Sequence, residues 1–252
     1  MIPRKIHYCR FGGKPLTALG KKCLKSWVKY FPNYDIIEWN ETNFDLNSCK
    51  YVKEAYEAGK WAFVSDYARY KILYEEGGIY FDTDVEVIRS FDGIVEMGAF
   101  IGCENPDTQT PLAINPGLGM GAGAGHPFFR EMMDEYESAS FYKADGSPDL
   151  CTIVERTTRH LKKHGAENTE RIQTVCGITV YPAVYFCPIN MNTGKLCVTE
   201  NTYSVHRYAA SWVDPKERLR GKVYFLIVRL LGEKNAKKAR RILGRKSGNE
   251  KK

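Results

Sequence analysis

No stretch of the 252 residues approaches the roughly 18 consecutive apolar residues that a membrane-spanning helix requires. The N-terminal segment MIPRKIHYCRFGG also lacks the apolar core and small-residue cleavage site of a secretory signal peptide. These absences predict a cytoplasmic protein. A hydrophobic fraction of 43% is enough for a substantial core, and the length favours one domain.

The eight cysteines lack a CxxC pair and the paired spacing of a zinc finger. Because several of them sit within apolar segments, we expect buried, reduced thiols rather than a disulfide framework or a zinc site. The cysteines are Cys9, Cys23, Cys49, Cys103, Cys151, Cys176, Cys187 and Cys197.

Negative charge is scarce at the C-terminus. Residues 216–252 hold 14 of the 37 Lys/Arg but 3 of the 30 Asp/Glu, a charge of +11, so residues 1–215 carry −4. An apolar patch at 223–231 runs into a basic stretch, which is typical of a helix lying on an anionic membrane surface. A core-packing helix followed by a disordered tail explains the composition equally well. We expect no specific nucleic-acid binding, since no basic groove with aromatic residues is evident.

Strand and helix patterns alternate along the chain. Residues 2–9 predict a strand, the apolar spacing over 16–31 predicts a helix, and residues 34–40 predict a second strand. This βαβ order implies a parallel sheet in an α/β fold. Residues 51–78 predict two helices that are broken near Gly59 and end at Gly77.

The segment GGIYFDTDVEVI, residues 77–88, alternates apolar and polar residues and predicts a buried strand. On an extended chain Asp82 and Asp84 share one face, with Cα atoms about 6.5 Å apart. Two carboxylates so placed can converge on one divalent cation at the carboxyl end of a sheet strand. A capped turn is the alternative explanation of a lone D-x-D pattern.

An acid and a guanidinium lie on the helix that leads into this strand. Asp66 and Arg69 are three residues apart, so they share a helix face near the predicted metal site. An arginine fork suits a sugar hydroxyl or a diphosphate oxygen. A local helix ion pair is the alternative.

Together, S-D-x-x-R and the following G-G-x-Y-x-D-x-D resemble the DXD glycosyltransferases of family 32, and they are similar to the glucosylating domains of large clostridial toxins. The resemblance runs from Ile2 to about Asp214 and is most specific over residues 65–84. It implies one GT-A domain over residues 1–215 with a mixed central sheet, followed by the tail at 216–252. It also implies a UDP- or GDP-sugar donor and Mn²⁺ or Mg²⁺.

The resemblance also implies roles for the motif residues. Asp84 would bind the metal directly, and Asp82 would reach the metal, the ribose or both. Asp66 and Arg69 would hold the donor sugar and complete the catalytic set. Tyr80 would pack near the donor.

The first strand, KIHYCRFGG, resembles the family's base-binding motif, in which an aromatic residue, often Trp, stands two positions before GG. This chain has Arg10 there, which leaves the choice between UDP and GDP sugars open. A guanidinium can also stack on a base. We expect His7, Tyr8 and Arg10 to line the donor site, although a core role bonded to backbone also suits His7.

Two further segments follow in family order. INPGLGMGAGAGHPFF, residues 114–129, is so rich in glycine that we expect a loop, with Asn115 near the transferred sugar, leading into a helix from His126. A plain surface loop is the alternative. In ENTYSVHRYAASWVD, His206 resembles a further metal ligand, and Ser211 with Trp212 resemble a lid that excludes water. A strand-end histidine and a core tryptophan are the alternatives there.

The implied function is metal-dependent, retaining transfer of a hexose to a glycan or lipid-linked acceptor, as in cell-surface or capsular polysaccharide synthesis at the inner membrane face. Two other classes stay open. One is a glycosyltransferase-type effector that modifies a protein. The other is a non-catalytic sugar- or nucleotide-binding module, which the presence of both Asp82 and Asp84 disfavours.

Overall fold

The computed structural model describes residues 1–190 and 195–209. Its elements divide between two units, residues 1–188 with 198–208 and residues 189–197 with 209–252. In the first unit the helices are α1 Ala18–Tyr30, α2 Lys50–Glu57, α3 Trp61–Glu76, α4 Asp92–Glu96, α5 Pro127–Glu137, α6 Ile153–Lys163 and α7 Ala183–Phe186. Its strands are β1 Lys5–Cys9, β2 Asp35–Trp39, β3 Gly78–Tyr80, β4 Val85–Val87, β5 Phe100–Cys103, β6 Ile114–Ala122, β7 Gln173–Val175, β8 Ile178–Tyr181 and β11 Ser204–His206. In the second unit β9 Ile189–Asn190 pairs antiparallel with β10 Lys195–Leu196.

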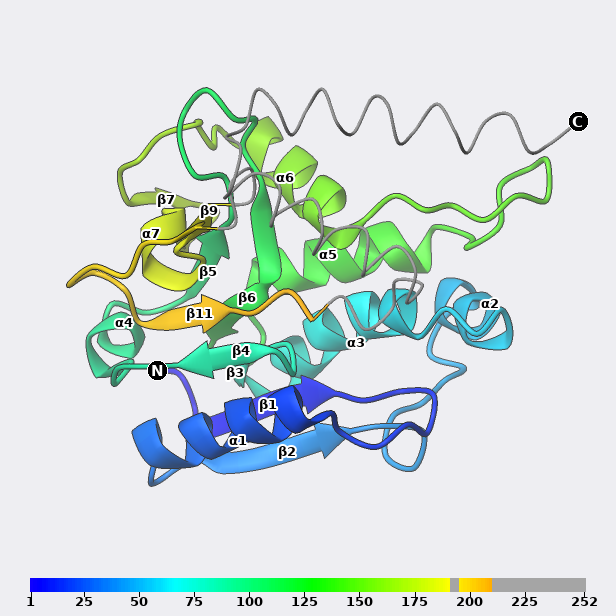
Figure 1. Ribbon diagram of the computed structural model, residues 1–252. Helices are drawn as coiled ribbons and strands as arrows, with labels where there is room; N and C mark the ends of the chain where they lie inside the picture. The colour runs from blue at the N-terminus through cyan, green and yellow to red at the C-terminus, as the bar shows by residue number, and fades with distance from the viewer. Residues whose placement is uncertain (191–194, 210–252) are drawn as a thin grey trace, which may run out of the picture. The chain divides into compact units, whose positions relative to one another are not determined.

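The main sheet formed by the described residues has the strand order β2-β1-β3-β6-β5-β8-β7 (Figure 1). Strands β2, β1 and β3 run parallel to one another, as do β5 and β8, whereas β6 and β7 run antiparallel to their neighbours. The α/β class and the mixed central sheet predicted from the sequence are therefore confirmed. Strands β1, β2, β3, β5 and β8 all point their carboxyl ends toward one edge of the sheet.

The predicted βαβ start and the pair of helices after it are confirmed. Thr17 Oγ1 accepts a hydrogen bond from Gly20 N and caps the start of α1. Gly59 and Gly77 have φ values of +66° and +63°, a backbone conformation that favours glycine, and they separate α2 from α3 and end α3.

Two hydrophobic cores cover the opposite faces of the sheet. In β3, Ile79 belongs to the core that contains Trp27 of α1, and Tyr80 belongs to the core beneath α2, α3, α5 and α6. Successive strand residues point to opposite faces, so this short strand serves both cores. Being buried on both sides, it holds the residues that follow it at a defined place.

The glycine-rich segment 114–122 is a strand, not the predicted loop. It forms β6, all of it buried, between β3 and β5. A Cβ atom at Gly119 would lie 2.8 Å from the Phe81 ring, and one at Gly121 would lie 2.6 Å from the Phe100 ring. Neighbouring aromatic rings fill the space that side chains of β6 would need, so these glycines serve packing within the sheet. The predicted helix after this segment is confirmed as α5.

None of the described helices is long and apolar enough to cross a membrane. No disulfide joins cysteines of the described residues; Cys23, Cys103 and Cys187 are buried, and Cys197 is exposed. The predicted basic tail at 216–252 lies outside the described residues.

Candidate metal centre

The three residues that the sequence proposes as metal ligands meet at one place. Asp82 follows β3, Asp84 precedes β4, and His206 ends β11, which pairs antiparallel with β4 (Figure 1). One ligand atom from each lies within 4.8 Å of the other two. His206 Nε2 is 3.1 Å from Asp84 Oδ1. We call these three residues the DXD cluster.

The acids reach this position through a turn and not through the extended strand expected from the sequence. Strand β3 ends at Tyr80, and residues 82–84 turn the chain so that Val85 N donates to Asp82 O at 3.0 Å. Strand β4 then pairs with β11 instead of extending the main sheet. The fully buried Trp27 of α1 donates from Nε1 to Val85 O at 2.8 Å, and this bond anchors the end of the turn to the core.

The donor set of the DXD cluster fits a divalent cation. Carboxylate oxygens suit Mg²⁺ and Mn²⁺, and Mn²⁺ also accepts imidazole. The side chain of Asp82 is 32% exposed, that of Asp84 14% and that of His206 9%, so the cluster opens to solvent through Asp82. Burial lowers the pKa of His206, but the adjacent Asp84 carboxylate outweighs it and the pKa is raised. The raised pKa of His206 shows that the two carboxylates of the cluster stabilise positive charge at this position.

Arg69 of α3 holds Asp82 from the protein side. Its Nη1 lies 3.3 Å from Asp82 Oδ1, its Nη2 lies 3.0 Å from Asp66 Oδ1, and its Nε donates to Ser65 O at 3.0 Å. The guanidinium also lies over the Tyr80 ring, 4.8 Å from its centroid, and Tyr80 OH donates to Asp82 Oδ1 at 3.1 Å. Asp66 and Arg69 are buried, so they support Asp82 instead of forming the open surface of the cluster.

Burial decides the protonation of Asp66. Removal from water raises the pKa of its carboxyl to about 7, even though Arg69 acts in the opposite direction. The Arg69 guanidinium thus lies between Asp82 and a second carboxyl group, Asp66, whose pKa is near neutrality.

Strand β6 supplies the other wall of the cluster. Asp82 N donates to Gly117 O at 3.1 Å, and Gly117 N donates to Asn115 Oδ1 at 2.8 Å. Asn115 Nδ2 in turn donates to Glu104 Oε2 at 2.7 Å, and Tyr208 OH donates to the same oxygen at 3.1 Å. Asn115, which the resemblance assigns to the neighbourhood of the transferred sugar, is therefore beside the DXD cluster, and its amide is engaged by neighbouring protein groups.

Gly117 provides room for the Asp82 carboxylate. A Cβ atom at this position would lie 2.1 Å from Asp82 Oδ2, too close for the present arrangement. We expect Gly117→Ala to displace Asp82, to weaken Mn²⁺ binding by at least about tenfold and to cost about 1–3 kcal/mol of stability through overpacking. Titration of free Mn²⁺ by electron paramagnetic resonance measures the first effect.

Gly93→Ala is the matched control, because a Cβ atom at Gly93 of α4 would have no neighbour closer than 3.8 Å. Gly93→Ala should keep the Mn²⁺ affinity and leave stability equal or slightly raised. Equal Mn²⁺ affinities in the two variants would contradict the role given to Gly117.

The ends of β1 and β2 carry a fixed guanidinium at the same sheet edge. Arg10 donates from Nε to Glu38 Oε1 at 3.0 Å and from Nη1 to Lys14 O at 2.6 Å. Tyr8 OH donates to Glu38 Oε2 at 2.8 Å. The hydrogen bonds from Arg10 outweigh the opposing effect of burial and, together with the bond from Tyr8, lower the pKa of Glu38 to about 2. Arg10 is half-buried and held in one orientation.

His7 has the core position that the sequence left open for it. Its side chain is fully buried, its Nε2 lies 2.9 Å from Gly77 O, and its Nδ1 accepts from Trp39 Nε1 at 3.1 Å. Burial lowers its pKa to about 4, so the ring is neutral at physiological pH. His7 ties β1 to the start of β3.

Ser211 and Trp212, which the resemblance implies as a lid, lie outside the described residues.

Sequence reasoning missed Glu104, Gly117 and Tyr208. A polar residue directly after the apolar run AFIGC was the available signal for Glu104, because it stands where a strand ends. Gly117 could not be assigned from sequence because its role depends on Asp82, which is distant in the chain.

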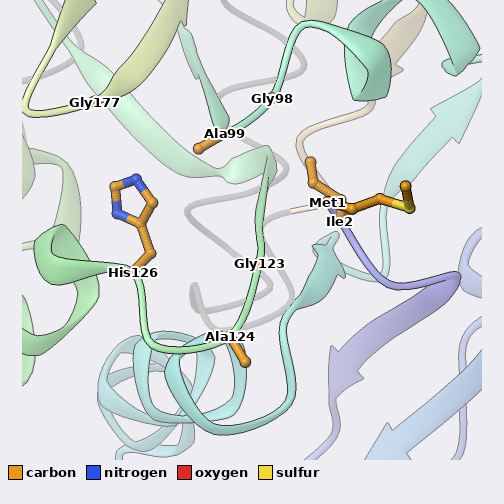
Figure 2. Close-up of a pocket in the computed structure, with 8 residues that line it drawn as sticks. All are labelled: Met1, Ile2, Gly98, Ala99, Gly123, Ala124, His126 and Gly177. Atoms are coloured by element: carbon orange, nitrogen blue, oxygen red, sulfur yellow. The ribbon is translucent and has the colours of Figure 1, made fainter.

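A pocket of about 310 Å³ lies at the opposite edge of the main sheet. Figure 2 shows its lining residues, among them Ala99 before β5, Gly177 before β8 and Gly123 after β6. Since Ala99 and Gly177 precede the amino ends of the parallel strands β5 and β8, the pocket is separate from the DXD cluster.

Part of this chain is similar in sequence to known glycosyltransferases. The family described as a glycosyltransferase sugar-binding region containing a DXD motif matches residues 18–100. Inositol phosphoceramide mannosyltransferase 3 of Schizosaccharomyces pombe is 27% identical over 141 residues, which cover 52% of this chain and 36% of that protein. The matched part thus spans about a third of the length of that relative.

Three solved structures resemble this chain at lower sequence identity than that relative. The PaToxG glycosyltransferase has a TM-score of 0.48 at 15% identity, covering 65% of this chain and 72% of that one. A glycosyltransferase involved in glycosylation of the major capsid of PBCV-1 has a TM-score of 0.46 at 12% identity, covering 87% and 100%. The galactosyltransferase LgtC has a TM-score of 0.41 at 11% identity, covering 86% and 94%. Scores below 0.5 decide neither the fold nor the substrate.

The family match contains Asp66, Arg69, Asp82 and Asp84, whereas Asn115 and His206 lie outside it. The supports of the acidic pair, Arg69 and Tyr80, fall within the matched region and within 5 Å of each other. Residues 18–100 of this chain are therefore similar to the glycosyltransferase sugar-binding regions that contain a DXD motif.

Proposed function

We propose that this chain is a metal-dependent hexosyltransferase of GT-A type that takes its sugar from a nucleotide-sugar donor. The observation that carries the proposal is the DXD cluster, in which two carboxylates and an imidazole within 4.8 Å of one another stand at the carboxyl edge of a mixed sheet. Ligands of open α/β sheets bind at that edge.

Asp82, Asp84 and His206 would hold Mn²⁺ or Mg²⁺. Such an ion, when bound, supplies positive charge that stabilises a leaving nucleoside diphosphate. The protein's own part is to keep the three ligands converged before the donor arrives. Trp27 anchors the turn, and Gly117 leaves space for the Asp82 carboxylate.

Arg69 acts in this proposal through Asp82. Its guanidinium is buried and engaged by Ser65, Asp66 and Asp82, which supports a positioning role. Arg10 is exposed enough to meet a ligand and is locked by Glu38, so we assign it the face on which the donor's base stacks.

The proposal extends to a retaining mechanism and to a glycan or lipid-linked acceptor, as in polysaccharide synthesis, with residues 216–252 as the contact to an anionic membrane. Retention is supported only by the family resemblance. NMR of the reaction product reports the anomeric configuration directly, and an inverted product would refute this part.

The donor class is tested by mass spectrometry of donor hydrolysis and transfer over a panel of UDP- and GDP-sugars. Each donor is offered with Mn²⁺, with Mg²⁺ and with EDTA. We expect turnover of one donor that stops in EDTA and returns when the ion is restored. Turnover that EDTA leaves unchanged would contradict metal dependence, and absence of both turnover and calorimetric nucleotide binding would contradict the transferase assignment.

A further inference from the structure

A second group of metal-ligating side chains lies away from the DXD cluster. His160 comes from α6 and His164 is the C-cap of that helix, while Cys176 comes from the turn between β7 and β8 and Glu131 from α5. The ligand atoms of His160, His164 and Cys176 all lie within 4.8 Å of one another. His160 Nε2 is 3.0 Å and His164 Nε2 is 3.9 Å from Glu131 Oε2. We call these four residues the hairpin cluster.

The chemistry of the hairpin cluster differs from that of the DXD cluster. Two imidazoles, one thiol and one carboxylate form a ligand set for Zn²⁺, whereas Mg²⁺ and Ca²⁺ prefer oxygen alone. Tetrahedral bonds of about 2.0–2.3 Å place zinc ligands about 3.3–3.8 Å apart. The side chains of His164 and Glu131 are each 47% exposed, so they are able to close the remaining distance.

The two histidines are spaced for joint ligation. His160 is in the last turn of α6 and His164, four residues later, is the C-cap of that helix, and their ring centroids are 4.9 Å apart. Phe128 packs edge-on against His160 and restricts its ring.

Cys176 occupies an unusual backbone position. Its φ is +51°, and Gly177 follows with φ +71°, as a two-residue hairpin turn of type I′ requires. Asn, Asp or Gly normally fills the first position, because other side chains are strained there. A residue with strained backbone at a turn points to a use for its side chain.

The turn that carries Cys176 is placed against the start of α5. A Cβ atom at Gly177 would lie 3.5 Å from His126 Nε2, and Figure 2 shows the His126 ring directed toward Gly177. The hairpin cluster is therefore at the amino-end edge of the parallel strands, opposite the DXD cluster.

We propose that Glu131, His160, His164 and Cys176 form a structural zinc site that joins α5, α6 and the β7–β8 hairpin. The sequence favoured reduced cysteines over zinc because it has no paired Cys spacing. The ligands here come from three separate elements, so spacing along the chain could not reveal them. The proposal does not depend on the proposed transferase activity.

Cobalt substitution tests the site, because a thiolate ligand produces a charge-transfer band that a carboxylate and imidazole site lacks. The full chain is stripped with EDTA, kept reduced and titrated with Co²⁺, and the bound Co²⁺ is then displaced by Zn²⁺. We expect one equivalent of tetrahedral, thiolate-bound Co²⁺ that Zn²⁺ replaces. Asp84→Asn should keep this band.

Cys176→Gly and His164→Asn are the test variants, and Cys151→Ser, at another half-buried cysteine, is the matched control. Glycine suits the positive φ at 176, so the first variant preserves the hairpin, and thermal unfolding without metal checks this. We expect both test variants to lose the thiolate band or weaken Zn²⁺ binding by at least about 100-fold, and Cys151→Ser to match wild type. Absence of the band in wild type, or its persistence in Cys176→Gly, would overturn the zinc site.

Discussion

Asp84→Asn should abolish metal-dependent nucleotide binding and lower donor turnover by at least about 10³-fold. A metal ion contributes several kcal/mol of charge stabilisation, and about 4 kcal/mol corresponds to that factor in rate. The substitution keeps the shape of the side chain but removes the carboxylate charge next to His206 Nε2. The backbone bond from Arg207 N to Asp84 O remains, so we expect the fold to persist. Calorimetry with Mn²⁺ and nucleotide, together with donor turnover, measures the two effects.

Asp92→Asn is the matched control for charge removal. Asp92 is exposed in the first turn of α4 and bonds to Ser90 Oγ, away from the DXD cluster. Its variant should bind nucleotide and turn over donor as the native chain does. Native nucleotide affinity in Asp84→Asn would contradict the metal assignment, whatever its turnover.

Arg69→Met should destabilise the protein by about 3–5 kcal/mol, because it removes the partner of two acids beneath the site. Asp66 is buried and would lose the only cation that lies within 4 Å of it in the described residues. Asp82 would lose its anchor on the protein side. The stability of Arg69→Lys should lie between that of the native chain and that of Arg69→Met. An ammonium retains the charge but lacks the planar fork that reaches both carboxylates. Urea unfolding followed by circular dichroism gives the free energies.

Arg130→Met provides the comparison on α5. Arg130 pairs with Asp134 and Glu137 at the surface, where ion pairs contribute about 1 kcal/mol or less. If Arg69→Met unfolds at the same urea concentration as Arg130→Met, the guanidinium beneath Asp82 does not have the structural role assigned to it.

The two metal-ligand clusters show how differently local and distant residues can be inferred. Asp82 and Asp84 are two residues apart and lie in one turn, so their proximity is a property of the local chain. Glu131 and Cys176 are brought together by the packing of α5, α6 and a hairpin. No pattern within a short window contains that information.

The segment 114–122 illustrates a failure of local reasoning. Glycine weakens an isolated strand, and for that reason a loop was predicted. In the folded protein, Asp82, Phe81 and Phe100 reach across the strand at Gly117, Gly119 and Gly121. Contacts made by neighbouring strands therefore stabilise β6, and these contacts exist only after the sheet has formed.

By itself the sequence determined the α/β alternation, the limits of α2 and α3, and the shared helix face of Asp66 and Arg69, since periodicity and glycine positions act over a few residues. Tertiary structure alone decided that β11 pairs with β4 and brings His206 to Asp84, and that Gly117 makes room for Asp82. It also decided that His7 belongs to the core and that Cys176 meets two histidines. The physical reason is that these contacts join residues far apart in the chain, whose meeting depends on how the whole sheet and its helices pack.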